Sequence, residues 1–198
     1  MKLSKGQILE LEVTSLAYGG MGIAHYENII IFVKGAIPGE KIKAKIYKKK
    51  KNYLEAYSIE KIQPSKHSTD PICEHFGICG GCSFQNLNYN EQLNQKNIQV
   101  RDLFTRIGGI KSPNINKIVG CQEHYNYRNK MEFSYSSNKW IPNLDEEGNS
   151  KDLNAFGLHV KGRYDKIVDI NECHINGNLS NKIFKSLKSI LADEGIKP

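Results

Sequence analysis

Five cysteines are the residues of this 198-residue chain with the most distinctive chemistry. Cys73, Cys79 and Cys82 lie within ten residues in the spacing C-x5-C-x2-C, with two glycines between the last two. Thiolate sites for zinc and for iron-sulfur clusters usually close with four protein ligands, so a fourth ligand is expected elsewhere. Structural zinc more often uses two separated cysteine pairs, and the three-plus-one arrangement therefore favours an iron-sulfur cluster. Zinc and ordinary free cysteine remain the alternatives.

Cys121 and Cys173 are the two cysteines that could supply the fourth ligand. Cys121 follows an apolar run and fits a small buried hydrophobic residue, which is the usual role of a free cysteine. Cys173 follows an expected strand, at an exit where a side chain can reach another loop, so its position is favoured. His75 and His174 adjoin cysteines and could coordinate zinc, but a histidine beside a cysteine is more often a neighbour than a ligand.

The composition predicts a folded cytoplasmic protein. Its 39% hydrophobic content is enough for packed cores, and the chain has no run of eighteen apolar residues and no signal-peptide apolar region. No membrane partner is therefore expected. In a reducing compartment, five cysteines indicate metal binding or catalysis rather than disulfides.

The net charge of +7 is concentrated in the first third of the chain. Residues 1–66 carry twelve lysines against six acidic residues, whereas residues 67–198 carry sixteen basic and fifteen acidic residues. Such an excess on a small domain indicates a polyanion partner, most commonly nucleic acid, although a lysine run can also be a solvated hairpin tip. The candidate phosphate-binding residues here are Lys41, Lys43, Lys45, Lys48, Lys49, Lys50 and Lys51.

Aromatic and further basic residues extend this candidate interface. Tyr18, Tyr47 and Tyr53 could stack on bases, with packing in the domain core as the alternative. Arg128 and Lys130 lie on an expected strand of the later domain and could also bind phosphate. For these two residues the alternative is solvated charge on an exposed strand face.

The elements that must position these residues follow from hydrophobic periodicity. Residues 6–63 show four or five short strands separated by glycine-marked turns, which predicts a small closed barrel of the OB type, with an SH3-like barrel equally allowed. Residues 64–71 have the composition of a linker. An amphipathic helix is expected at 88–107, ended by two glycines.

The last third of the chain predicts a small antiparallel sheet followed by a helix. Strand patterns occur at 127–136, 154–160 and 164–170, and the polar stretch 142–152 between the first two reads as a loop. A final helix is expected within 177–195, with Ser180 as its N-cap.

Taken in order, these motifs resemble the RNA uracil-5-methyltransferase family. The similar segments are the cysteine motif CEHFGICGGC at 73–82, QNLNYNEQLNQK at 85–96, YRNKMEFSY at 127–135 and VDINECHI at 168–175. Residues 6–25 and 35–46 look like the TRAM domain, an OB-like RNA-binding barrel that precedes the cluster domain in these enzymes.

The resemblance implies a domain organisation and a cofactor. It implies a TRAM barrel at 1–63, a linker at 64–71 and a central α+β iron-sulfur domain at 72–198, with the helix at 88–107 packing on a methyltransferase domain. In the family, the matching cysteines hold a four-iron, four-sulfur (4Fe-4S) cluster, regarded as structural or as an aid to RNA recognition. The ligands by residue matching are Cys73, Cys79, Cys82 and Cys173.

The family's reaction transfers a methyl group from S-adenosylmethionine to C5 of a uridine, using a cysteine nucleophile and an acidic residue. This sequence contains no strand-G-x-G-x-x-G-helix pattern, and none of its five cysteines matches the nucleophile. No catalytic or cofactor-binding residue is therefore assigned. The expectation is the amino-terminal part of such an enzyme, with ribosomal RNA favoured over transfer RNA and a separately encoded methyltransferase domain as a further partner. The alternatives are a stand-alone RNA-binding iron-sulfur module and a cluster-based redox sensor.

Overall fold

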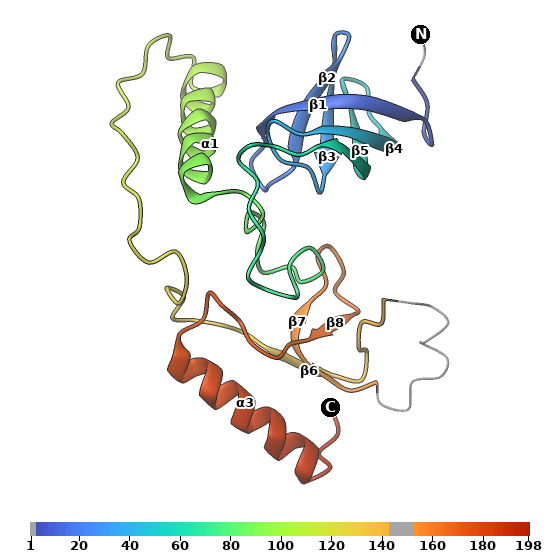
Figure 1. Ribbon diagram of the computed structural model, residues 1–198, viewed down its shortest axis with the longest axis vertical. Coiled ribbons are helices and arrows are strands. Elements are labelled where there is room, and N and C mark those ends of the chain that lie inside the picture. Colours follow the sequence, from blue (N-terminus) through green and yellow to red (C-terminus); the bar gives the residue numbers. More distant parts are fainter. Residues whose placement is uncertain (1–2, 143–152) are drawn as a thin grey trace. The chain divides into compact units, whose positions relative to one another are not determined.

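The computed structural model describes residues 3–142 and 153–198 and divides the chain into two compact units (Figure 1). The first, which we call the barrel unit, contains Met1–Asp70 and Phe84–Gly120. The second, the cysteine unit, contains Pro71–Ser83 and Cys121–Pro198. None of the helices in the described ranges is long and apolar enough to cross a membrane.

Five strands close into a barrel in the order β1-β2-β3-β5-β4 (Figure 1). The strands are β1 (Ile8–Leu16), β2 (Gly22–Tyr26), β3 (Ile29–Lys34), β4 (Lys41–Lys49) and β5 (Tyr53–Gln63). Adjacent strands are antiparallel except β3 and β5, which are parallel. Alternate apolar residues such as Leu11, Ile42 and Leu54 fill the interior, so their neighbours point outward. The closed five-stranded topology agrees with the OB-like alternative.

A buried carboxylate fixes the turn between β3 and β4. Glu40 is fully buried, and its Oε2 accepts a hydrogen bond of 3.0 Å from the amide of Ile37 while its Oε1 lies 2.6 Å from Nζ of Lys61. Ser65 is also buried and donates its hydroxyl to the carbonyl of Pro38 at 2.6 Å. The segment that composition assigns to a linker is thus attached to the barrel at its first residues.

The central helix belongs to the barrel unit and is attached to β1 by amide side chains. Helix α1 runs from Tyr89 to Asp102, with the side chain of Asn88 accepting a cap hydrogen bond from the amide of Glu91. Buried Gln95 accepts from the amide of Leu16 at 2.9 Å, and Gln99 donates to the carbonyl of Leu16 at 3.0 Å. The sequence places this segment in the domain at 72–198, whereas these contacts group it with the barrel.

The expected helix changes form before its end. The last five of the residues expected to be α-helical, Leu103–Ile107, form a π-helical turn, η1. Leu103, Phe104 and Ile107 are exposed in this structure. The apolar residues at the end of the expected helix therefore form a surface that no other described residue buries.

The cysteine unit contains a three-stranded antiparallel sheet covered by a helix (Figure 1). Its elements are β6 (Ser134–Ser136), β7 (Ala155–His159), β8 (Ile167–Asp169) and α3 (Asn178–Asp193). Phe184 of α3 stacks on Phe156 of β7, with ring centroids 4.7 Å apart. All three strands are shorter than the sequence pattern suggests. Of the loop expected at 142–152, residues 143–152 lie outside the described residues.

The final helix begins earlier than predicted. Gly177 is its N-cap, so the assignment of Ser180 to that position is wrong. Asn181 faces inward instead and is buried. Its side chain hydrogen-bonds to the amide and carbonyl of Cys173, which gives the first turn of α3 a role in positioning that cysteine.

Asp169 connects the sheet to α3 through a half-buried carboxylate. Its Oδ1 lies 2.8 Å from Nζ of Lys188 and accepts from the amide of Phe156, and its Oδ2 lies 3.3 Å from Nζ of Lys139. Burial alone would raise the pKa of Asp169, but the hydrogen bonds from Lys188 and Phe156 and the two lysine charges outweigh it and lower the pKa. The ionised form is therefore the one that stabilises the fold.

We expect Asp169→Asn to reduce the free energy of unfolding of the cysteine unit by about 2 kcal/mol at neutral pH, because a charge-assisted hydrogen bond is lost. A carboxylate with a lowered pKa in the folded state stabilises fully above its ordinary pKa of about 3.9 and loses that effect as the pH falls through the folded value. Denaturant unfolding at several pH values between 7 and 3 measures the free energy of unfolding of the variant and of the unchanged protein. If the difference between these two free energies does not become smaller below pH 4, the stabilising role of ionised Asp169 is contradicted.

Candidate cysteine site and nucleic-acid interface

Cys73, Cys79, Cys82 and Cys173 belong to the cysteine unit, and the thiol of Cys79 interacts electrostatically with the other three. Cys73, Cys79 and Cys82 are half-buried on the loop at Pro71–Ser83, and Cys173 is buried after β8. Burial raises the pKa of the Cys79 thiol, the Gly81 amide lowers it in part, and the charges of Cys82, Cys173 and Cys73 raise it further. Among the residues that the structure describes, no three His, Cys, Asp or Glu side chains form a group that could hold a single metal ion.

Backbone amides two residues downstream point at the first two of these thiols. The amide of Gly81 donates to Sγ of Cys79 at 3.4 Å. Burial raises the pKa of Cys73, and a hydrogen bond from the amide of His75 acts against it. Both amides stabilise the thiolate, which is the form that binds metal.

Cys173 has the same kind of surroundings. Burial raises the pKa of its thiol, whereas hydrogen bonds from the amides of Ile175 and Asn176 lower it. Asn181 holds the backbone of Cys173 at both its amide, 3.1 Å, and its carbonyl, 3.0 Å. Asn181 therefore holds the backbone of Cys173, and with it the position of the thiol, in the loop after β8.

The cysteine loop is hydrogen-bonded to the end of β7. The amide of Gly80 donates to the carbonyl of His159 at 2.9 Å, and the amide of Lys161 donates to the carbonyl of Ile78 at 2.8 Å. A Cβ on Gly80 would lie 3.1 Å from the carbonyl oxygen of His159, and one on Gly81 would lie 3.5 Å from Sγ of Cys79. Gly80 thus allows the backbone to approach the sheet closely, whereas the distance at Gly81 is an ordinary van der Waals contact.

The remaining cysteine and the two neighbouring histidines have other surroundings. Cys121 is exposed, and its thiol donates to the carbonyl of Glu123 at 3.0 Å, so the expectation of a buried hydrophobic residue is wrong. His75 accepts from the amide of Asn171 through Nε2 at 3.3 Å. His174 is half-buried in the turn after Cys173.

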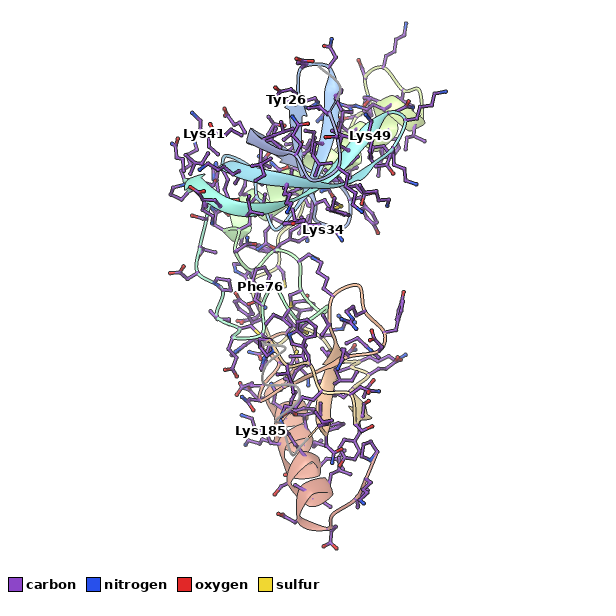
Figure 2. All side chains as sticks on the ribbon, turned by 90° about the vertical axis from the view of Figure 1, so that its right-hand side faces the viewer. Tyr26, Lys34, Lys41, Lys49, Phe76 and Lys185 are labelled. Atoms are coloured by element: carbon purple, nitrogen blue, oxygen red, sulfur yellow. The ribbon has the colours of Figure 1, made fainter. Side chains whose placement is uncertain are left out.

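The lysines of the barrel divide into two groups. Lys43 pairs with Glu60 at 2.9 Å, Lys48 pairs with Glu55 at 2.8 Å, and Nζ of Lys49 donates to the carbonyl of Leu3 at 2.7 Å. No ion pair at 4 Å or less appears within the described ranges for the other candidates, which are Lys41, Lys45, Lys50 and Lys51. Figure 2 shows Lys34, Lys41 and Lys49 on the outside of the barrel. The second group is better placed to neutralise phosphate.

Two tyrosines and a lysine form an aromatic surface on the barrel that the sequence did not reveal as a unit. The rings of Tyr47 and Tyr57 stack with centroids 6.1 Å apart, and Nζ of Lys34 lies 4.9 Å from the centroid of Tyr47. Burial and then the hydrogen bond to Glu55 raise the pKa of Tyr47, so its hydroxyl stays protonated. We call Lys34, Tyr47 and Tyr57 the tyrosine platform.

The other candidate tyrosines are placed differently. Tyr53 packs edge-to-face on Phe32 with centroids 5.3 Å apart, beside the platform. Tyr18 is 90% exposed in the turn between β1 and β2. The sequence did not identify Lys34 and Tyr57 as candidate RNA-binding residues. They lie side by side because β3 pairs with β5, which places Lys34 opposite Tyr57.

Arg128 and Lys130 do not lie on a strand, because β6 begins only at Ser134. Both are exposed: Nε of Arg128 donates to the carbonyl of Lys130, and Lys130 pairs with Glu132 at 2.9 Å. They line an open pocket of about 480 Å³ in the cysteine unit together with Gly80 and Gly81.

Comparisons with known proteins identify a domain family and several relatives of this chain. The TRAM domain family matches residues 2–57. A protein of Bacteroides thetaiotaomicron named an uncharacterized RNA methyltransferase is 36% identical over 87% of this chain and 38% of its own length. One of Chlorobaculum tepidum with the same name is 32% identical over 100% of this chain and 42% of its own length.

A solved structure shows the same fold over most of the chain. The crystal structure of the Pyrococcus abyssi tRNA (uracil-54, C5)-methyltransferase in complex with S-adenosyl-L-homocysteine superposes with a TM-score of 0.58 and 22% identity. The match covers 94% of this chain and 37% of that protein. This chain therefore spans about two fifths of the length of the proteins it matches. It carries a TRAM domain and belongs to the RNA methyltransferase family.

Proposed function

We propose that this chain is the amino-terminal, RNA-binding and iron-sulfur part of an S-adenosylmethionine-dependent RNA uracil-C5 methyltransferase. The observation that carries the proposal is the combination, in one chain, of a TRAM barrel with four cysteines, three on the loop at Pro71–Ser83 and one directly after β8 in the same unit. The solved structure with the same fold is named for uracil C5 methylation. Methyl transfer and the binding of S-adenosylmethionine belong, in this proposal, to a domain outside the 198 residues.

In the proposed cofactor site, Cys73, Cys79, Cys82 and Cys173 hold one 4Fe-4S cluster. The cluster, when bound, would cross-link the cysteine loop to the exit of β8, and its binding energy would add to the stability of the cysteine unit. A single tetrahedral zinc ion, with Zn–S bonds of about 2.3 Å, would require sulfur atoms only about 3.8 Å apart. A cluster spaces its four thiolates more widely because the iron and sulfide ions lie between them.

The proposed RNA site is the tyrosine platform with the unpaired lysines of the barrel. Stacking on Tyr47 and Tyr57 accepts any base, because every base has a π-face. Lys34, Lys41 and Lys45 would neutralise neighbouring phosphates, and Lys50 and Lys51 at the tip of the β4–β5 hairpin would extend the contact. The barrel thus binds and orients a single-stranded segment of RNA.

The proposed substrate is ribosomal RNA, with 23S rRNA as the specific expectation. Deleting the gene that encodes this chain and measuring 5-methyluridine by mass spectrometry, separately in rRNA and tRNA, tests the function. We expect one 5-methyluridine to disappear from 23S rRNA and to return when the gene is restored. Loss from tRNA alone would overturn the assignment to rRNA. Unchanged 5-methyluridine in both fractions would overturn the proposed function and favour a stand-alone RNA-binding module.

A further inference from the structure

The pocket of about 480 Å³ in the cysteine unit has a size that suits a small ligand. Its walls come from three segments: the glycines of the cysteine loop, the segment before β6, and the hairpin between β7 and β8. The residues that carry the argument are Arg128, Lys130, Glu132, His159, Arg163 and Tyr164. All of them belong to the cysteine unit, whereas the tyrosine platform belongs to the barrel unit.

The charged side chains that line the pocket carry a net positive charge, although Lys130 pairs with Glu132 at 2.9 Å. Arg128, Lys130 and Arg163 contribute three positive charges, against the single carboxylate of Glu132. Asp165 pairs with Arg163 at the rim, where 46% of the arginine side chain and 61% of the aspartate side chain remain exposed. Such exposed pairs are weak, and they exchange readily for a contact with phosphate.

An exposed aromatic ring stands at the rim of the pocket. Tyr164 is 93% exposed, and it lines the pocket beside Arg163. An aromatic ring next to cationic side chains is the combination with which proteins hold single-stranded nucleic acid, by stacking on a base and neutralising the adjacent phosphate.

The hairpin that carries Tyr164 is held in place by backbone hydrogen bonds. The amide of Arg163 donates to the carbonyl of Val160 at 2.9 Å, and the amide of Val160 donates to the carbonyl of Lys166 at 3.0 Å. Gly162 has a φ of 77°, which an L-amino acid with a side chain rarely adopts, so the tight turn depends on it. The cysteine loop adds the hydrogen bond from Gly80 to His159. The rim is therefore preorganised.

We propose that this pocket is a second RNA contact, which binds one nucleotide of a single strand with its base on Tyr164 and its phosphate between Arg163 and Arg128. The inference rests on the proposed function, because it takes RNA as the ligand. It assigns to the cysteine unit a share of RNA recognition that does not depend on the barrel.

Trp140 provides a local measurement of this pocket. It is the only tryptophan in the chain, and the guanidinium of Arg163 lies 5.9 Å from the centroid of its ring. A nucleotide that engages Arg163 should change the fluorescence of Trp140, whereas RNA on the barrel alone should not. The probe is a hexamer of uridylate with a fluorescent end label, whose anisotropy reports total binding.

We expect the midpoint of the Trp140 response to move to at least about tenfold higher RNA concentration in Tyr164→Ala, because stacking is lost. Tyr164→Phe should keep the midpoint of the unchanged protein. Arg163→Gln should weaken the response, while Lys182→Gln, which removes one exposed charge from α3, should leave it unchanged. Equal effects of the two charge variants, or no effect of Tyr164→Ala, would overturn the pocket as a site.

The same titration separates failure of this inference from failure of the proposed function. If anisotropy shows RNA binding but the Trp140 response does not depend on Tyr164, only the proposal of the pocket as an RNA site is refuted. If neither measurement shows binding, both this proposal and the proposed function are refuted. In a barrel variant with Tyr47→Ala and Tyr57→Ala, we expect the anisotropy to fall while the Trp140 response persists.

Discussion

Replacing Cys173 by serine is expected to remove the iron and sulfide from the protein. Serine is nearly the same size as cysteine but does not bind the cluster, and the backbone contacts of this position with Asn181 are preserved. Because metal binding contributes directly to folding, the unfolding temperature of the cysteine unit should fall by about 10 °C or more. Iron and labile sulfide assays after anaerobic purification, with thermal unfolding followed by circular dichroism, measure both effects.

Cys121→Ser is the matched control for this variant. Cys121 is exposed, and its thiol donates to the carbonyl of Glu123. We expect the metal content and unfolding temperature of this variant to equal those of the unchanged protein. Retention of iron by Cys173→Ser, or its loss from Cys121→Ser, would show that the fourth ligand has been assigned incorrectly.

Removing the tyrosine platform is expected to have the second largest effect. The double variant with Tyr47→Ala and Tyr57→Ala should bind single-stranded RNA at least about tenfold more weakly, because base–aromatic stacking contributes about 1–3 kcal/mol per base. Tyr57→Phe keeps the ring and should bind normally. Fluorescence anisotropy with a labelled oligonucleotide measures the affinity. An unchanged affinity in the double variant would contradict the tyrosine platform as the RNA contact.

Two lysines on the same strand separate phosphate contact from surface charge. Lys45 faces outward opposite Tyr57, whereas Lys43 pairs with Glu60. Each phosphate contact on a single strand adds about 0.7 to the slope of log affinity against log salt concentration. We expect Lys45→Gln to reduce the slope by about this amount and Lys43→Gln to leave it nearly unchanged. Equal changes in the two variants would contradict the division of the lysines.

Much of the barrel could be predicted from the sequence, because each strand shows its own pattern. Leu9, Leu11 and Val13 alternate with outward residues on β1, and all three are buried. Strand pairing could not be predicted in the same way. Tyr47 and Tyr57 meet across the β4–β5 hairpin, but Lys34 joins the tyrosine platform only because β3 pairs with β5, and a pairing between strands distant in the sequence leaves no local signal.

The position of helix α1 was the largest difference from the sequence prediction. A helix is usually assigned to a neighbour by its apolar face, but Gln95 and Gln99 attach this one through hydrogen bonds to β1. Glutamine is normally solvent-exposed, so its burial could not be read from periodicity. The strand expected around Arg128 does not form, because β6 begins only at Ser134. An alternating pattern in the sequence does not show whether a partner strand is available.

The proposed cysteine site, which stays a prediction, rests partly on a spacing that is local in the sequence. The C-x5-C-x2-C spacing and the glycines suggested a loop around a compact inorganic centre, and in the structure the amide of Gly81 donates to Sγ of Cys79. The amides that face Cys173, by contrast, depend on how the chain leaves β8 and enters α3. That geometry required the three-dimensional structure.

The assignment of one cluster to Cys73, Cys79, Cys82 and Cys173 is tested most directly by the metal content of the anaerobically purified chain. The assay determines iron, acid-labile sulfide and zinc in the same sample. We predict about four iron and four sulfide ions per chain, with little zinc, as a single cluster requires. One zinc ion per chain without labile sulfide, in a protein that remains folded, would contradict the assignment.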